Sequence, residues 1–201
     1  MKIFLKAGSI LFHPLFIPVI SSALYFYLTP RFIDREWAGV HLSSIAIITI
    51  AIPIVVYFIL KTFRKVESIH LSDVRERKYP LMIQSILLLL VIKTVLDPLD
   101  NPELYYFFVG LLFSAFSALI LVLFRFKISL HQMGISAVLI FLIGLSVHFK
   151  IHILISISFI LFANGWVASS RLLNKAHTGI ELIIGFLFGA LPQFILYNMW
   201  L

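Results

Sequence analysis

The sequence contains no cysteine, and charged residues make up only 12% of its 201 positions. Without cysteine the chain can form neither disulfide bonds nor metal sites built from thiolates. The charged fraction is about half of that in a typical soluble domain, which excludes an ordinary water-soluble fold. A separate soluble domain is excluded as well, because the loops between apolar segments are at most about 18 residues long and chains below about 40 residues seldom fold alone.

Hydrophobic residues instead make up 61% of the chain, and the mean hydropathy is +1.06. A helix needs about 20 mostly apolar residues to cross a bilayer, whereas unpaired strands would leave backbone groups unsatisfied in lipid. The pattern predicts transmembrane helices at roughly 8–28, 41–62, 80–96, 104–124, 132–149, 151–168 and 178–199. We therefore expect an all-α, polytopic transmembrane helical bundle of six or seven spans, forming a single integral membrane domain over residues 1–201 in a bacterial inner membrane.

Lysine and arginine together outnumber acidic residues by 16 to 9, which gives a net charge of +7. Because these cations lie in short loops beside apolar segments, membrane orientation and anionic headgroups explain them better than nucleic acid, and no nucleic-acid partner is expected. The predicted topology places 12 of the 16 cations on the face that carries the N-terminus and 4 on the other. This bias favours a cytoplasmic first face, but cations that hold a substrate are not topology signals, so the orientation stays open.

Three segments on the first face carry an unusual set of polar residues. They are "HLSDVRERKYP" at 70–80, "KISLHQMG" at 127–134 and "SSRLLNKAHTGIE" at 169–181. The candidate site residues that they supply are Arg75, Arg77, Lys78, Lys127, Ser129, His131, Ser170, Arg171, His177 and Glu181. Guanidinium and ammonium groups beside hydroxyls are typical of a phosphate site. Two histidines at such a site could supply a nucleophile and a proton donor, so that neither a metal nor another cofactor is expected.

His177 and Glu181 are four residues apart at the start of the last predicted helix, and so share one face of it. A carboxylate there can accept a hydrogen bond from one imidazole nitrogen and leave the other nitrogen able to attack. The helix N-terminus also favours an incoming anion. In the same helix Gly185 and Gly189 form a GxxxG pattern, which is typical of close helix packing.

The segment "SRLLNKAHTGIE" resembles the third motif, SRxxxxxHxxxD, of the type 2 phosphatidic acid phosphatase (lipid phosphate phosphatase) superfamily. Ser170, Arg171 and His177 stand at the matching positions, and Glu181 replaces the aspartate. "SLH" at 129–131 resembles a degenerate second motif, PSGH, in which isoleucine and leucine replace the proline and glycine.

The first motif of that superfamily, KxxxxxxRP, is matched poorly. Arg77 and Pro80 are candidates for its end, but they are not adjacent, and His70 stands where the lysine is expected. The resemblance covers about thirty residues in three blocks, of which the third is the most specific.

The resemblance implies a metal-independent phosphatase that acts on a lipid phosphate or diphosphate within the bilayer. It implies that His177 attacks phosphorus to give a phosphohistidine, that Glu181 orients His177, and that His131 protonates the leaving oxygen. The residues implied to bind the substrate phosphate or steer its headgroup are Arg171, Ser170, Ser129, Lys127, Arg77, Arg75 and Lys78.

Two other functions remain open from the residues alone. One is an inactive relative that binds anionic lipid, or a small transporter. The other is a Mg²⁺-dependent prenyl- or phosphatidyl-transferase, for which Asp73 and Glu76 would supply oxygen ligands. His13, about one turn inside the first predicted span, is interpreted as part of a proline-kinked helix start rather than as a site residue. The sequence does not indicate which lipid would be the substrate, nor an oligomeric state.

Overall fold

The structure is a computed structural model that describes residues 2–64 and 74–200. This part of the chain is mainly helical and contains no strand, so the prediction of an all-α bundle is confirmed. In chain order the elements are α1 (Lys2–Leu11), α2 (Ile17–Leu28), α3 (Arg35–Ala46), the π-helical turn η1 (Ile47–Ala51), α4 (Ile52–Thr62), the 3₁₀ turn η2 (Arg75–Arg77), α5 (Lys78–Thr94), α6 (Pro102–Leu123), α7 (Leu130–Phe149), α8 (Leu154–Leu173), α9 (Gly179–Leu196) and the 3₁₀ turn η3 (Tyr197–Met199).

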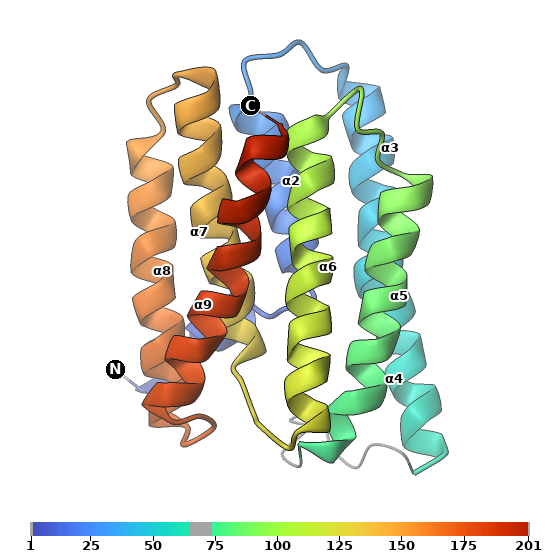
Figure 1. Ribbon diagram of the computed structural model, residues 1–201, viewed down its shortest axis with the longest axis vertical. Coiled ribbons are helices and arrows are strands. Elements are labelled where there is room, and N and C mark those ends of the chain that lie inside the picture. Colours follow the sequence, from blue (N-terminus) through green and yellow to red (C-terminus); the bar gives the residue numbers. More distant parts are fainter. Residues whose placement is uncertain (1, 65–73, 201) are drawn as a thin grey trace.

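The long helices run side by side along the vertical axis of Figure 1. Helices α7, α8 and α9 form one side of the bundle, α5 and the continuous α3–η1–α4 rod form the other, and α6 and α2 lie between them. Within the described residues five helices are long and apolar enough to cross a membrane, namely the α3–α4 rod, α6, α7, α8 and α9 with η3. Helix α5 has 17 residues and α2 has 12, so the expected six or seven spans are matched only roughly.

The first predicted span, 8–28, is wrong as a single helix. Helix α1 ends at Leu11 and α2 begins at Ile17, with Pro14 in the break and Pro18 in the first turn of α2. Proline has no N–H to donate and disfavours helical backbone in the residue before it, which explains the interruption. Helix α1 packs against α8 instead, where Trp166 Nε1 donates a hydrogen bond of 2.8 Å to the Phe4 carbonyl.

Two further boundaries differ from the prediction. Helix α3 begins at Arg35, within the predicted loop 29–40, because the Asp34 carboxylate caps it by accepting from Trp37 N at 2.9 Å. Helix α8 continues to Leu173, so that Ser170 and Arg171 belong to its last turn rather than to a loop.

Close packing of α9 on α7 sets the geometry at one end of the bundle. A Cβ on Gly185 would come within 2.8 Å of the Ser129 carbonyl, and one on Gly189 would overlap the Met133 carbonyl. Only glycine allows this approach, as the GxxxG pattern suggested. It brings Ser129 N to 3.3 Å from the Glu181 carbonyl, and so places the start of α9 beside the start of α7. The starts of α5, α7 and α9 and the end of α8 all lie at this end, the lower one in Figure 1.

Candidate functional site

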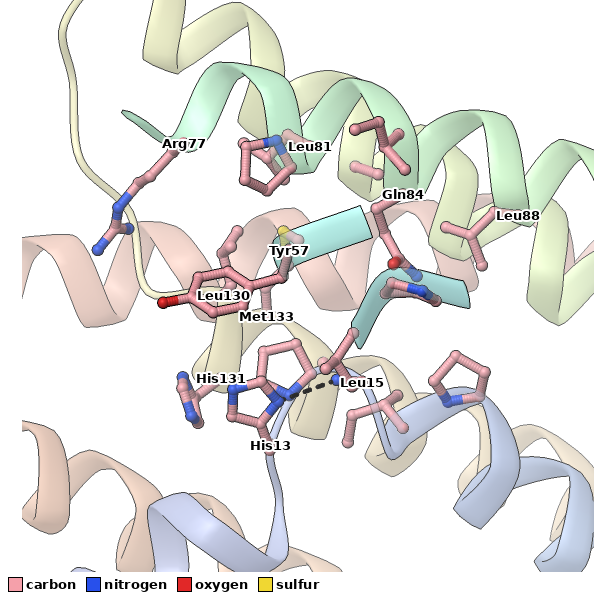
Figure 2. Close-up of a pocket in the computed structure, with 18 of the residues that line it drawn as sticks. His13, Leu15, Tyr57, Arg77, Leu81, Gln84, Leu88, Leu130, His131 and Met133 are labelled. Atoms are coloured by element: carbon pink, nitrogen blue, oxygen red, sulfur yellow. Dashed lines mark hydrogen bonds between the residues drawn. The ribbon is translucent and has the colours of Figure 1, made fainter. Parts of the chain in front are cut away.

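A cavity of about 380 Å³ reaches this end of the bundle and extends between α2, α4, α5, α6 and α7. One part of its wall is polar and is formed by His13, Arg77, His131, Arg171 and His177. The rest of its wall is almost entirely apolar. Figure 2 shows Arg77 reaching inward from the start of α5, His131 on α7 and His13 in the break before α2. The structure thus brings together residues from all three polar segments of the sequence and from the α1–α2 break.

His177 and Glu181 form the most sharply defined contact of the site. The buried His177 lies in the loop between α8 and α9, and its Nδ1 is 2.8 Å from Glu181 Oε2. Thr178 caps α9 by accepting from Glu181 N, while the same carboxylate oxygen of Glu181 accepts from Thr178 N at 3.1 Å. This capping box fixes the carboxylate, which in turn holds the Nδ1 proton of His177. Nε2 of His177 makes no hydrogen bond among the described residues.

The surroundings of His177 disfavour its protonated form. Burial lowers the pKa of this imidazole to about 4, and the charges of Arg77, Arg171 and Lys127 contribute to the lowering, whereas the hydrogen bond to Glu181 opposes it. At neutral pH the ring is therefore uncharged, with a proton on Nδ1 and a lone pair on Nε2. A neutral imidazole with an oriented proton can act as a nucleophile.

Arg77 and Arg171 give the polar wall its positive charge. The buried Arg77 donates to the Ile128 carbonyl at 3.0 Å, and burial together with the charge of Arg171 lowers the pKa of this guanidinium to about 10. Nε of Arg171 is buried without a hydrogen-bond partner among the described residues. A buried donor left unpaired costs free energy, and a bound anion would remove that cost.

Lys127 lies beside this pair without lining the cavity. Partial burial lowers the pKa of its ammonium group, and the neighbouring charge of Arg77 lowers it further. The wall therefore carries more positive charge than the Glu181 carboxylate neutralises, which is the electrostatic character expected of an anion site.

His131 is hydrogen-bonded to the N-terminal helix α1. Its Nε2 is 3.1 Å from the Ser9 carbonyl, so that this nitrogen carries a proton and donates it there. The Ser9 hydroxyl is in turn 2.6 Å from the buried Ser170 hydroxyl at the end of α8. Ser170 therefore positions His131 through Ser9, and it does not line the cavity itself.

Ser129 and Lys78, which were also predicted to bind the phosphate, do not line the cavity. Ser129 is fully buried, and its hydroxyl caps α7 by accepting from Gln132 N. Lys78 is exposed at the first residue of α5. The side chain of Arg75, together with His70 and Asp73, lies outside the described residues. Within the described residues, no three histidine or acidic side chains are grouped so that they could hold a metal ion.

Two cavity residues were not assigned to a site by the sequence. His13 was interpreted as part of a helix start, and its Nδ1 does accept from Leu15 N at 3.3 Å in that turn, yet its ring also lines the cavity 5.1 Å from the His131 ring. Tyr57 comes from α4, and its hydroxyl is buried without a partner among the described residues. Figure 2 shows this hydroxyl directed toward the polar end of the cavity. The polar, proline-bounded position of His13 was a usable signal, whereas Tyr57 stands in an apolar run without one.

Beyond the polar wall the cavity continues into the bundle along apolar side chains. Pro18, Leu81, Leu88, Leu111 and Ala115 contribute to this part, and the α4 side adds Ile54 and Phe58. Helix α4 has no buried residue of its own and forms an outer wall of the cavity. Such a site, with a charged end and a long apolar extension, fits an amphipathic ligand.

No protein-family model, curated protein or solved structure matches this chain.

Proposed function

We propose that this protein is a membrane-embedded phosphatase that hydrolyses a lipid phosphate or diphosphate through a phosphohistidine intermediate. The observation that carries the proposal is the convergence of His177, His131, Arg77 and Arg171 on the charged end of a cavity whose other walls are apolar. The resemblance of the Ser170–Glu181 segment to lipid phosphate phosphatases points to the same chemistry. We also place the protein, as part of this proposal, in a bacterial inner membrane.

In the first step His177 attacks the phosphorus atom. The Nε2 lone pair forms an N–P bond while the bond between phosphorus and the lipid oxygen breaks. Positive charge that develops on the imidazole is balanced by Glu181, which lies 2.8 Å from Nδ1. Glu181 thus acts as a positioning and charge-balancing residue, in the way that a carboxylate orients a catalytic histidine in other hydrolases.

His131 provides the proton that the leaving oxygen needs. The Ser9 carbonyl holds the proton of Nε2 at 3.1 Å, so the transferable proton is a second one on Nδ1, which His131 takes up as an imidazolium when the phosphate anion binds beside it. In the second step a water molecule attacks the phosphohistidine, the N–P bond breaks, and the water proton passes to Nδ1 of His131. Inorganic phosphate leaves, and both histidines return to their starting states.

The guanidinium groups of Arg77 and Arg171 stabilise charge on the non-bridging phosphate oxygens. This contribution grows in the transition state, because the groups are preorganised in a partly buried site and need not reorganise. The hydroxyl of Tyr57 supplies an additional donor at the same end. The apolar extension of the cavity takes the hydrocarbon next to the phosphate group, and the rest of the lipid remains in the bilayer.

The test is an assay of phosphate release by detergent-purified protein from a panel of lipid phosphates, with and without EDTA. We expect release that survives EDTA and is at least about 10³-fold slower in His177→Ala. Rapid quenching should trap an acid-labile, alkali-stable phosphoprotein that is absent from that variant. Release abolished by EDTA would instead favour the Mg²⁺-dependent transferase reading, and lipid binding without release from any lipid phosphate would favour a binding protein or transporter.

A further inference from the structure

One imidazole at the charged end of the cavity has no role in the chemistry above. His13 lies in the break between α1 and α2 and lines the cavity. Its ring centroid is 5.1 Å from that of His131, and the two ring planes are nearly perpendicular, at 86°. Figure 2 shows the two rings beside each other at the same end of the cavity. At this separation both rings can reach one bound group.

The backbone fixes which nitrogen of His13 carries the proton. Leu15 N donates to Nδ1 of His13 at 3.3 Å, so that Nδ1 must offer a lone pair and the proton of the neutral ring is on Nε2. This Nε2 makes no hydrogen bond among the described residues. In Figure 2 it lies on the side of the ring that is nearer to His131 and away from Leu15. His13 therefore presents an oriented N–H donor at the charged end.

The surroundings keep His13 in this neutral form. Burial lowers the pKa of its imidazole, and the positive charge of Arg171 lowers it further. A second proton on Nδ1 would also meet the N–H of Leu15 instead of a lone pair. Because Nδ1 is engaged by the backbone, the ring cannot pass a proton from one nitrogen to the other, and a relay role is excluded. What remains for His13 is to donate from Nε2.

We infer that His13 is a further phosphate-binding residue, whose Nε2–H donates to an oxygen of the substrate phosphate. This inference rests on the proposed function for the nature of the ligand. Since His131 serves the leaving oxygen in that proposal and lies beside His13, the oxygen that His13 reaches is near the leaving group. A donor without a partner at a partly buried site is costly, and an anionic acceptor makes the stronger kind of hydrogen bond.

Two substitutions separate the two nitrogens of His13. His13→Asn keeps an acceptor for Leu15 N, because an asparagine oxygen accepts from the N–H two residues later in an Asx-turn, but it loses the donor at the Nε2 position. His13→Gln places an amide NH₂ near the position of Nε2 and loses the acceptor near the backbone. A role of His13 in binding phosphate requires the first variant to be impaired and the second to be nearly normal.

The measurement is the Kd of two anions that the protein cannot hydrolyse, by titration calorimetry in a detergent without phosphate. Inorganic phosphate tests the anion alone, and decylphosphonate, with a carbon–phosphorus bond, stands for the headgroup of a lipid. We expect His13→Asn to weaken both by roughly tenfold to a hundredfold, which is the value of a hydrogen bond to a charged group. His13→Gln should stay within about threefold of the wild type.

His41→Asn is the matched control. His41 is also partly buried and has Nδ1 bonded to the backbone, at 2.8 Å from the Trp37 carbonyl, but it does not line the cavity. Both Kd values should keep their wild-type values in this variant. The inference is overturned if His13→Asn binds both anions normally, if His13→Gln is impaired as strongly as His13→Asn or more so, or if only the binding of inorganic phosphate is weakened.

The binding data and the hydrolysis assay can fail separately. Weaker binding of both anions by His13→Asn alone supports the role of His13 even if wild type releases phosphate from no lipid, in which case only the phosphatase proposal fails. Normal binding by His13→Asn overturns the role of His13 even if the wild-type protein hydrolyses lipid phosphates through His177.

Discussion

Two polar clusters lie at opposite ends of the bundle, and they are built differently. At the end away from the cavity, the fully buried carboxylate of Glu103 has Arg31 at 2.8 Å, His148 at 3.2 Å and the Tyr25 hydroxyl at 2.9 Å. None of these side chains lines the cavity. At the cavity end, the cations outweigh the carboxylate of Glu181, and Nε of Arg171 has no partner among the described residues.

The difference distinguishes a polar cluster that stabilises a fold from one that awaits a ligand. Around Glu103 opposite charges meet and donors find acceptors, so the cluster ties the segment before α3, the start of α6 and the end of α7 together. Around His177 like charges are gathered, burial lowers the pKa of the imidazole, and donors face a cavity. Such an arrangement is unfavourable by itself, which is the usual signature of a functional site.

We expect the largest change in activity when an arginine is removed from the cavity end, and little change when one is removed from the Glu103 cluster. Arg171→Ala should lower kcat/KM for a lipid phosphate by roughly 10³-fold, because it removes a preorganised cation from the transition state. Arg31→Ala removes the same side chain from the Glu103 cluster and should change activity per folded molecule less than about twofold while lowering Tm. Phosphate-release kinetics and thermal unfolding in detergent check both. Similar losses of activity in the two variants would contradict the different roles that we assign to the two clusters.

Replacing Glu181 or Glu103 by glutamine tests the same difference between the two clusters. Glu181→Gln should lower kcat by roughly 10²-fold, since the amide no longer balances charge on the His177 ring and fixes its tautomer less well. Glu103→Gln should leave kcat within about twofold and lower Tm, because Arg31 and His148 lose their carboxylate. Steady-state kinetics with unfolding curves measure both. A Glu181→Gln protein with wild-type kcat would contradict the positioning role.

Tyrosine hydroxyls offer a smaller test. Both Tyr57 and Tyr197 have a buried hydroxyl without a partner among the described residues, but only Tyr57 lines the cavity. Tyr57→Phe should reduce kcat/KM by about fivefold to tenfold, the value of one hydrogen bond, and Tyr197→Phe should leave it unchanged. Kinetics of the two variants with one substrate decide this. Equal values for both would show that the Tyr57 hydroxyl makes no contact with the phosphate end.

The smallest effect concerns pH. Because the pKa of His177 is lowered to about 4, its imidazole should stay neutral as the pH falls from 7 to 5 and become protonated only when the pH falls through about 4. Nitrogen NMR of histidine-labelled, ligand-free protein should show a resonance that titrates near pH 4 and is missing in His177→Ala. A resonance assigned to His177 that titrates near 6.5 would mean that burial does not lower the pKa of this imidazole.

Sequence patterns predicted much of the fold because the bilayer restricts the possibilities. Long apolar runs gave the helices α6 to α9 to within a few residues, apart from the C-terminal extension of α8. The break between α1 and α2 was missed because apolar length was given more weight than Pro14 and Pro18, although proline opposes helix continuation. Asp34, a good N-cap, would also have indicated the early start of α3.

The candidate site was predictable only where polarity stood out against an apolar background. His177, Arg171 and His131 stood out because charge and imidazole are costly near lipid. Ser129 and Ser170 were assigned to phosphate, whereas their hydroxyls cap α7 and contact Ser9, because a sequence does not show which way a hydroxyl points. The contribution of Tyr57 depends on how α4 packs beside α5 along the cavity, which no local pattern encodes.

The contact between α1 and His131 has a practical consequence for handling the protein. An N-terminal helix that does not cross the bilayer is often treated as a dispensable anchor, convenient for affinity tags or for trimming. Here the Ser9 carbonyl orients an imidazole of the candidate site, and Phe4 ties that helix to Trp166. Under the proposed mechanism, removing or displacing α1 would therefore impair the proton transfer assigned to His131.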